Sequence, residues 1–97
     1  MVISIVGRRW FQKTYGNTYH TAQIAVSYAG TTRHIHTARE YGYGDSYMQT
    51  AQEVLAKLIA ENEIPVPAPT YPLTIWAREN GIDLHYQAID VARQKDL

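Results

Sequence analysis

Hydrophobic residues near the start of the chain gather in a β-branched run, which is typical of a strand. The residues of this run are Val2, Ile3, Ile5 and Val6. The polar and aromatic residues that follow can continue the strand toward Tyr15, where Gly16-Asn17 supplies the residues of a tight turn. We therefore expect a strand, a turn and a second strand.

The next segment alternates between apolar and polar positions, as a strand with one buried face does. The apolar series is His20, Ala22, Ile24, Val26 and Tyr28. After a second turn at Ala29-Gly30, the segment 31–38 is rich in threonine and β-branched residues, which predicts a third strand. Residues 1–40 are therefore predicted to form an antiparallel β-meander with one apolar face.

A helix is predicted to follow the glycines at positions 42 and 44. Ser46, with Gln49 three positions later, matches a capping box, so the helix should begin at residue 46. Over 46–62 the apolar residues recur at helical spacing; they are Tyr47, Met48, Ala51, Val54, Leu55, Leu58 and Ile59. We expect this stripe to cover the apolar face of the sheet.

The last third of the chain holds all four prolines, a short helical pattern and a further strand. The prolines lie in the segment 63–72 and favour an extended connector. The pattern of residues 73–80 predicts a short helix that is capped by Gly81. After Gly81, apolar positions alternate as in a strand. The tail 92–97 is either a frayed end or a single helical turn.

These elements predict one α+β domain over residues 1–97, in the order β-β-β-α-α-β. We expect an antiparallel sheet of three to four strands with the helices packed on one face. The predicted parts are a β-meander (1–40), a main helix (46–62), a proline-rich connector (63–72) and a short helix, strand and tail (73–97).

Composition narrows the possible partners. Nine basic residues balance nine acidic ones, so no global field draws the chain to nucleic acid or membranes, although five basic residues precede the first acidic one, Glu40. The absence of cysteine excludes disulfides, thiolate zinc sites and thiol nucleophiles. The N-terminal apolar run precedes the arginines, the reverse of a secretory signal, and no stretch approaches the roughly 20 apolar residues of a membrane span. We expect a cytoplasmic protein without membrane contacts.

Signatures of catalysis are not found in the chain. The sequence has no Gly-x-Ser-x-Gly, no His-Glu-x-x-His and no dinucleotide-binding glycine pattern. We therefore expect neither an enzyme nor a cofactor.

Basic and aromatic side chains crowd the predicted first hairpin. They are Arg8, Arg9, Trp10, Phe11, Lys13, Tyr15, Tyr19 and His20. Arginine forks bind phosphate oxygens in pairs and aromatic faces stack on bases, so these residue types are typical of a site for nucleotides. The alternative is a twisted hairpin held together by aromatic cross-strand pairs, with its charges in solvent.

A glycine-punctuated loop leads into the predicted main helix. Its candidates for ligand binding are Tyr41, Tyr43, Gly44 and Ser46. Unpaired amides and the positive end of the helix dipole make such a helix start a natural anion site, and a tyrosine beside it can stack on a ring. Asp45 opposes this interpretation because it brings a negative charge to the same place. In the alternative, the glycines only turn the chain.

Two further groups of residues have both a structural and a functional interpretation. His34 and His36 share a strand face that His20 can approach, and three imidazoles can hold zinc, but no carboxylate is evident to orient the rings, so we expect no metal. Trp76 and Tyr71 are expected in the core. If they were exposed, they would form an apolar anchor for a partner chain.

Four stretches in the first half of the chain resemble a pattern found in small bacteriophage proteins. The stretches are GRRWF at 7–11, GNTYH at 16–20, YGYGD at 41–45 and QTA at 49–51. The resemblance carries no defined activity. It implies a protein of the host-cell cytoplasm that acts on host machinery or host defence by stoichiometric binding.

Two functions compete on these grounds. In the first, the hairpin and the loop form a shared cradle that captures a nucleotide-like signalling ligand of host defence or a nucleic acid, and a homo-oligomer completes the pocket. In the second, the chain inhibits a host protein complex, as anti-CRISPR proteins do, through a sheet edge or the region of Trp76. Arginines, rings and a helix start in one half of the chain favour the first.

Overall fold

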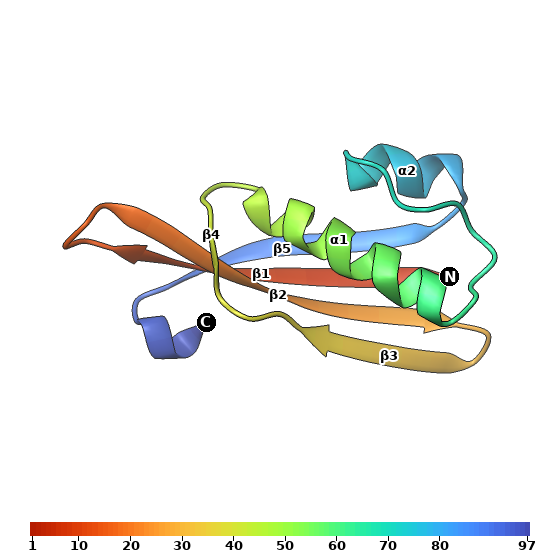
Figure 1. Ribbon diagram of the computed structural model, residues 1–97, viewed down its shortest axis with the longest axis horizontal. Coiled ribbons are helices and arrows are strands. Elements are labelled where there is room, and N and C mark those ends of the chain that lie inside the picture. Colours follow the sequence, from red (N-terminus) through yellow and green to blue (C-terminus); the bar gives the residue numbers. More distant parts are fainter.

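The computed structural model describes residues 1–97 and contains one sheet and two α-helices (Figure 1). The strands are β1 (Val2–Gln12), β2 (Asn17–Tyr28), β3 (Thr31–His36), β4 (Glu40–Tyr41) and β5 (Asp83–Val91). The helices are α1 (Ser46–Glu61) and α2 (Leu73–Glu79), and the chain ends in the 3₁₀ turn η1 (Gln94–Asp96). The predicted α+β class is confirmed. Neither α-helix has the length and the apolar run that crossing a membrane requires.

The sheet has the strand order β3-β2-β1-β5, and the short β4 pairs with β2 beyond the end of β3. β1, β2 and β3 form the antiparallel meander that the sequence predicts. β5 instead runs parallel to β1, so the sheet is mixed and the prediction of a purely antiparallel sheet is wrong for this strand. Between β4 and β5 the chain crosses the sheet through α1 and α2, and such a crossover returns it in the direction of β1.

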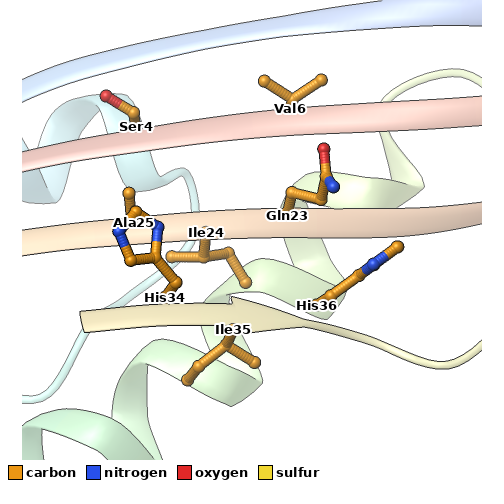
Figure 2. A pocket seen from close by; sticks show the side chains of 8 residues that line it. All are labelled: Ser4, Val6, Gln23, Ile24, Ala25, His34, Ile35 and His36. Atoms are coloured by element: carbon orange, nitrogen blue, oxygen red, sulfur yellow. The ribbon is translucent and has the colours of Figure 1, made fainter.

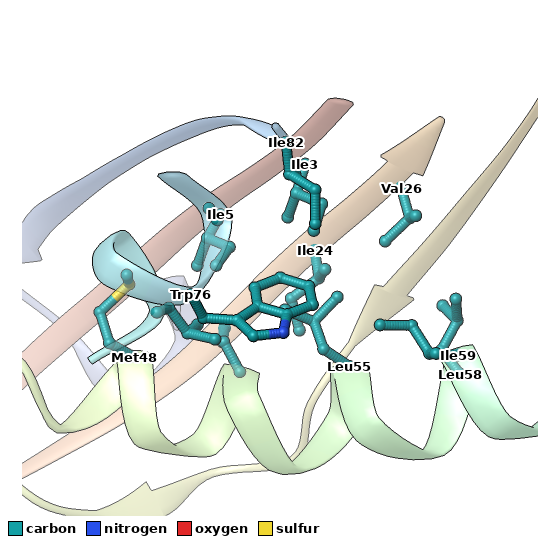
Figure 3. Packing of buried hydrophobic residues seen from close by; sticks show 14 of the residues in the cluster. Ile3, Ile5, Ile24, Val26, Met48, Leu55, Leu58, Ile59, Trp76 and Ile82 are labelled. Carbon is teal, nitrogen blue, oxygen red and sulfur yellow. The ribbon is translucent and has the colours of Figure 1, made fainter. Parts of the chain in front are cut away.

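The hydrophobic core lies between the sheet and the two helices (Figure 3). α1 buries most of its predicted stripe, namely Tyr47, Met48, Ala51, Leu55, Leu58 and Ile59. These side chains pack against the alternating apolar residues of β1 and β2, such as Ile5 and Ile24. Trp76 of α2 is only 3% exposed and donates its indole N–H to the Pro67 carbonyl at 3.2 Å, so it is a core residue and not an exposed anchor. Tyr71 is instead 50% exposed, because it lies in the bend before α2 and not on the buried side of the helix, so its predicted place in the core is wrong.

α1 begins at the predicted residue but not by the predicted mechanism. Asp45 precedes the helix and makes no side-chain capping bond. The Ser46 hydroxyl donates backward to the Tyr43 carbonyl at 2.7 Å, so the capping box with Gln49 does not form. The serine already has helical backbone, and its side chain therefore stabilises the preceding turn rather than the first helical amides.

A glycine in β1 allows α1 to approach the sheet closely. A Cβ atom added at Gly7 would lie 2.3 Å from Cγ of Tyr47, so the tyrosine ring occupies the space that any other residue would fill. Tyr47 is 2% exposed and lies in the first turn of α1. Gly7 therefore determines how the start of α1 sits on β1.

Candidate functional site on the open sheet face

The two faces of the sheet have different surroundings. Side chains alternate along a strand, so Ile3, Ile5 and Gly7 of β1 face α1, while the residues between them face the other way. Residues paired across neighbouring strands share a face, which extends the assignment to β2, β3 and β5. We call the face away from α1 the open face, because neither α1 nor α2 packs on it.

The neighbouring arginines of β1 lie on opposite faces. Arg9 pairs with His20 on the α1 side, and Arg8 pairs with Thr21 on the open face. Gly44 belongs to the α1 side, because Nη1 of Arg9 donates to its carbonyl at 3.0 Å. The hairpin and the glycine-tyrosine loop therefore meet on both faces, but Arg8 does not share a face with Arg9 and Gly44, so the prediction of one cradle that contains all three is wrong.

On the α1 side, Arg9 of β1 forms hydrogen bonds to β5 and to the glycine-tyrosine loop. Its Nε donates to Oδ1 of Asp90 at 2.7 Å, so the guanidinium charge already has a carboxylate partner. Tyr43 is exposed and lines a shallow depression with Arg9 and Gly44. Burial raises the pKa of the Tyr47 hydroxyl above its usual value, Asp45 and Tyr86 raise it further, and Arg9 opposes the rise. The Tyr47 hydroxyl therefore stays protonated at neutral pH.

His20 is a buried structural residue that connects β2, the loop and α1. Its Nδ1 lies 3.2 Å from the Gly42 carbonyl oxygen and its Nε2 lies 2.7 Å from Oγ1 of Thr50. A carbonyl oxygen only accepts, so in the neutral ring Nδ1 carries the proton and the Thr50 hydroxyl donates to Nε2. His20 is 2% exposed and both its ring nitrogens are used, so its assignment to ligand binding is wrong.

Three other predicted residues lie away from any shared site. The Ser46 hydroxyl donates its hydrogen bond to the Tyr43 carbonyl and does not face a ligand site. Lys13 and Tyr15 are exposed in the turn of the first hairpin, beyond the last ladder pair of β1 and β2. This turn projects from one end of the elongated molecule (Figure 1).

Aromatic side chains converge on the open face near β4. Trp10 and Tyr19 are a ladder pair whose rings stack with their centroids 6.0 Å apart and an interplanar angle of 24°. Tyr41 pairs with Tyr19 and meets its ring edge-on at 5.8 Å. Cζ of Arg39 lies 4.7 Å from the centre of the Tyr19 ring. We define the aromatic cluster as Arg8, Trp10, Tyr19, Arg39 and Tyr41.

The sequence pattern does not identify Arg39 as a site residue. Arg39 lies in the irregular link between β3 and β4, where no periodicity assigns a side chain to a face. Its position over Tyr19 follows from the pairing of β4 with β2, which involves only two residues of β4. The one available indication was that Arg39 is the last basic residue before the first acidic one.

The charges of this neutral chain are unevenly distributed around the sheet. Arg8 and Arg39 form no ion pair, whereas Arg9 is paired. The carboxylates of Glu40 and Asp90 belong to ladder pairs of the α1 side. The remaining strand carboxylate, that of Asp83, lies at the opposite end of the open face. Arg8 and Arg39 therefore have no ion-pair partner and no strand carboxylate beside them on the open face.

The three-histidine arrangement considered from the sequence does not form. His34 and His36 lie on the open face, as ladder partners of Ala25 and Gln23, whereas His20 points toward α1. No group of three or more histidine, cysteine, aspartate or glutamate side chains is close enough to hold a metal ion.

Thr21 provides a test of the packing on the open face. It is 5% exposed, and its hydroxyl has no hydrogen-bond partner. Because a buried unpaired hydroxyl costs about 1–3 kcal/mol, Thr21→Val is expected to raise the free energy of unfolding by about 1 kcal/mol, measured by denaturant unfolding. Thr37→Val is the matched control, since the Thr37 hydroxyl accepts the Ala22 N–H at 2.9 Å, and its removal is expected to destabilise. A loss of stability in Thr21→Val would show that the Thr21 hydroxyl does have a hydrogen-bond partner in the folded protein.

The fold and the site together define an α+β domain whose open sheet face carries aromatic rings and two arginines without ion-pair partners. No family model, curated protein or solved structure matches the chain. The resemblance to small bacteriophage proteins therefore stays a prediction, and the function is argued from the geometry.

Proposed function

We propose that the chain is a non-catalytic binding protein whose aromatic cluster takes a flat, anionic ligand of the nucleotide or nucleic-acid class. The observation that supports this best is the convergence of three rings and two unpaired arginines on one patch of the open face. Bases present flat faces to such rings, and phosphates present oxygens to arginine forks.

The aromatic cluster has exposed surface to offer and is already arranged. Tyr41 is 66% exposed and Arg39 is exposed, while Trp10 and Tyr19 are half-buried and held by strand pairing. A base stacked on such a ring contributes about 1–3 kcal/mol. Because the backbone of Trp10 and Tyr19 is fixed before binding, less side-chain and loop ordering opposes association.

The biological context remains part of the proposal. We place the protein in the cytoplasm of a phage-infected host, as a homo-oligomer directed against host defence, with a nucleotide-like signalling molecule among its possible ligands. The alternative is stoichiometric inhibition of a host protein complex. Because Trp76 is buried, its candidate surface is reduced to the exposed Tyr71, and the inhibitor alternative depends mainly on a sheet edge.

The experiment compares two exposed tyrosines that lie two residues apart. Tyr41→Ala removes a ring from the aromatic cluster, whereas Tyr43→Ala removes a ring from the α1 side. Binding of AMP, cyclic di-AMP and a six-nucleotide oligothymidylate is measured by calorimetry. For the probes that bind, Tyr41→Ala is expected to weaken binding about tenfold and Tyr43→Ala less than about twofold.

Charge is tested separately with Arg39→Gln, which is expected to weaken binding and make it less dependent on salt, because one phosphate contact is lost. Equal losses in Tyr41→Ala and Tyr43→Ala would show that the aromatic cluster is not the site. Failure of all three probes to bind the unmodified chain would reject the proposed function.

A further inference from the structure

The open face continues beyond the aromatic cluster into two shallow grooves. Ser4 and Val6 of β1 line both of them. The groove toward β3 has a volume of about 410 Å³, and its polar lining residues besides Ser4 are Gln23, His34 and His36 (Figure 2). We call it the histidine groove. The second groove lies toward β5 and is lined by His85 and Gln87.

We infer that the ligand is a single-stranded nucleic acid several nucleotides long, which runs along the open face from the aromatic cluster to the histidine groove. This inference rests on the proposed function and specifies its ligand. The histidine groove contains the groups that additional nucleotides require. The exposed rings of His34 and His36 can stack on bases, and the Gln23 amide can hydrogen-bond to base edges.

The strand register gives the distance between the two parts of the path. Trp10 and Ser4 lie on the same face of β1. The strand between them is about 20 Å long, at about 3.3 Å per residue. Arg8 and Val6 lie between them on that face. A nucleic-acid strand advances about 3.4 Å per stacked nucleotide and up to about twice that when stretched, so the path fits roughly three to six nucleotides. A mononucleotide would cover only one end of it.

The charges and the small side chains along the path suit a polyanionic strand. Arg8 contributes a cation where the path leaves the aromatic cluster, and the small side chains of Ser4 and Ala25 let a ligand approach the sheet closely. Asp83 is the one strand carboxylate on the open face, lies beside Val2 at its far end, and is bound to His85 at 3.1 Å. In a duplex the bases stack on one another and leave no faces for the rings, so the open face favours a single strand.

The test uses oligothymidylates of one, two, four, six and eight nucleotides with the full chain, and measures affinity by fluorescence anisotropy. Affinity is expected to rise at least about tenfold between two and six nucleotides and then to level off. The double variant His34→Ala/His36→Ala is expected to weaken binding of six nucleotides about tenfold and of two nucleotides less than about twofold. Arg33→Gln is the matched control, because Arg33 lies on β3 but faces the α1 side, and it is expected to leave both affinities unchanged.

The outcomes separate the inference from the proposed function. If AMP or cyclic di-AMP binds as tightly as six nucleotides and Tyr41→Ala still weakens it, the ligand is small, the inference is overturned and the proposed function stands. Binding of a thymidine–adenine duplex as tight as that of the single strand also overturns the inference. If no oligothymidylate and no mononucleotide binds, both fail.

Discussion

Replacing Gly7 with alanine is expected to lower the free energy of unfolding by about 3 kcal/mol or more. The added Cβ would lie 2.3 Å from Cγ of Tyr47, and this atom is the base of a buried ring rather than the tip of a flexible side chain. Tyr47 must therefore move, and the first turn of α1 must move with it. In thermal unfolding, the midpoint should fall by about 12 °C or more, at about 4–8 °C per kcal/mol for a chain of this size.

Two comparisons separate this steric effect from other effects of glycine. At Gly16 an added Cβ meets no atom within 4 Å, but φ is +70°, so Gly16→Ala is expected to cost only about 1 kcal/mol through the backbone. In a Tyr47→Ala background the obstructing ring is gone, and Gly7→Ala should then cost less than about 1 kcal/mol. Additive losses in the double variant would show that Gly7 is not required by Tyr47.

The elements that the sequence predicts well are those that depend on neighbours a few residues away. The alternation that begins at His20 gives both the strand and its buried face, because side chains of a strand point to the two faces in turn. The spacing of apolar residues gives α1 to within one residue at its end, 61 against the predicted 62. Each of these features is complete within one segment of the chain.

The direction of β5 depends on distant contacts and was not predictable from its own pattern. Its alternation is the same for parallel and antiparallel pairing, so only the crossover through α1 and α2 determines that it runs with β1. The two-residue β4 is also too short for periodicity, although it brings Tyr41 to the aromatic cluster. Arg39 and Tyr41, two of the five residues of the aromatic cluster, are therefore assigned to the open face only by the sheet topology.

The separation of Arg8 from Arg9 was, by contrast, contained in the prediction of a strand. Adjacent residues of a strand point to opposite faces, so the two arginines cannot contact one ligand from one strand. The alternation also places Arg8 with Trp10, and the pairing of β1 with β2 adds Tyr19. Chemical similarity alone therefore does not place two strand residues in one site, whereas the face on which each lies does.

His20→Ala is expected to lower the free energy of unfolding by about 2–4 kcal/mol, because it leaves a cavity and removes the partners of the Gly42 carbonyl and the Thr50 hydroxyl. His20→Asn places an amide donor near the position of Nδ1 and can keep the bond to Gly42, so it should lose about half as much. His36→Ala, at an exposed histidine, is the control and should change stability by less than about 0.5 kcal/mol. Denaturant unfolding measures all three.

The His20 variants also connect stability to binding. Gly42 follows Tyr41 directly, so the bond from His20 to the Gly42 carbonyl holds the backbone that carries one ring of the aromatic cluster. Amide exchange at Gly42, whose N–H donates to the Thr18 carbonyl at 3.0 Å, should be faster in His20→Ala than in His20→Asn. Under folding conditions His20→Asn should bind the six-nucleotide oligothymidylate nearly as well as the unmodified chain, whereas His20→Ala should bind it more weakly. Unchanged exchange at Gly42 in His20→Ala would mean that the other bonds of the loop hold it without His20, and that His20 stabilises only the attachment of α1 to β2.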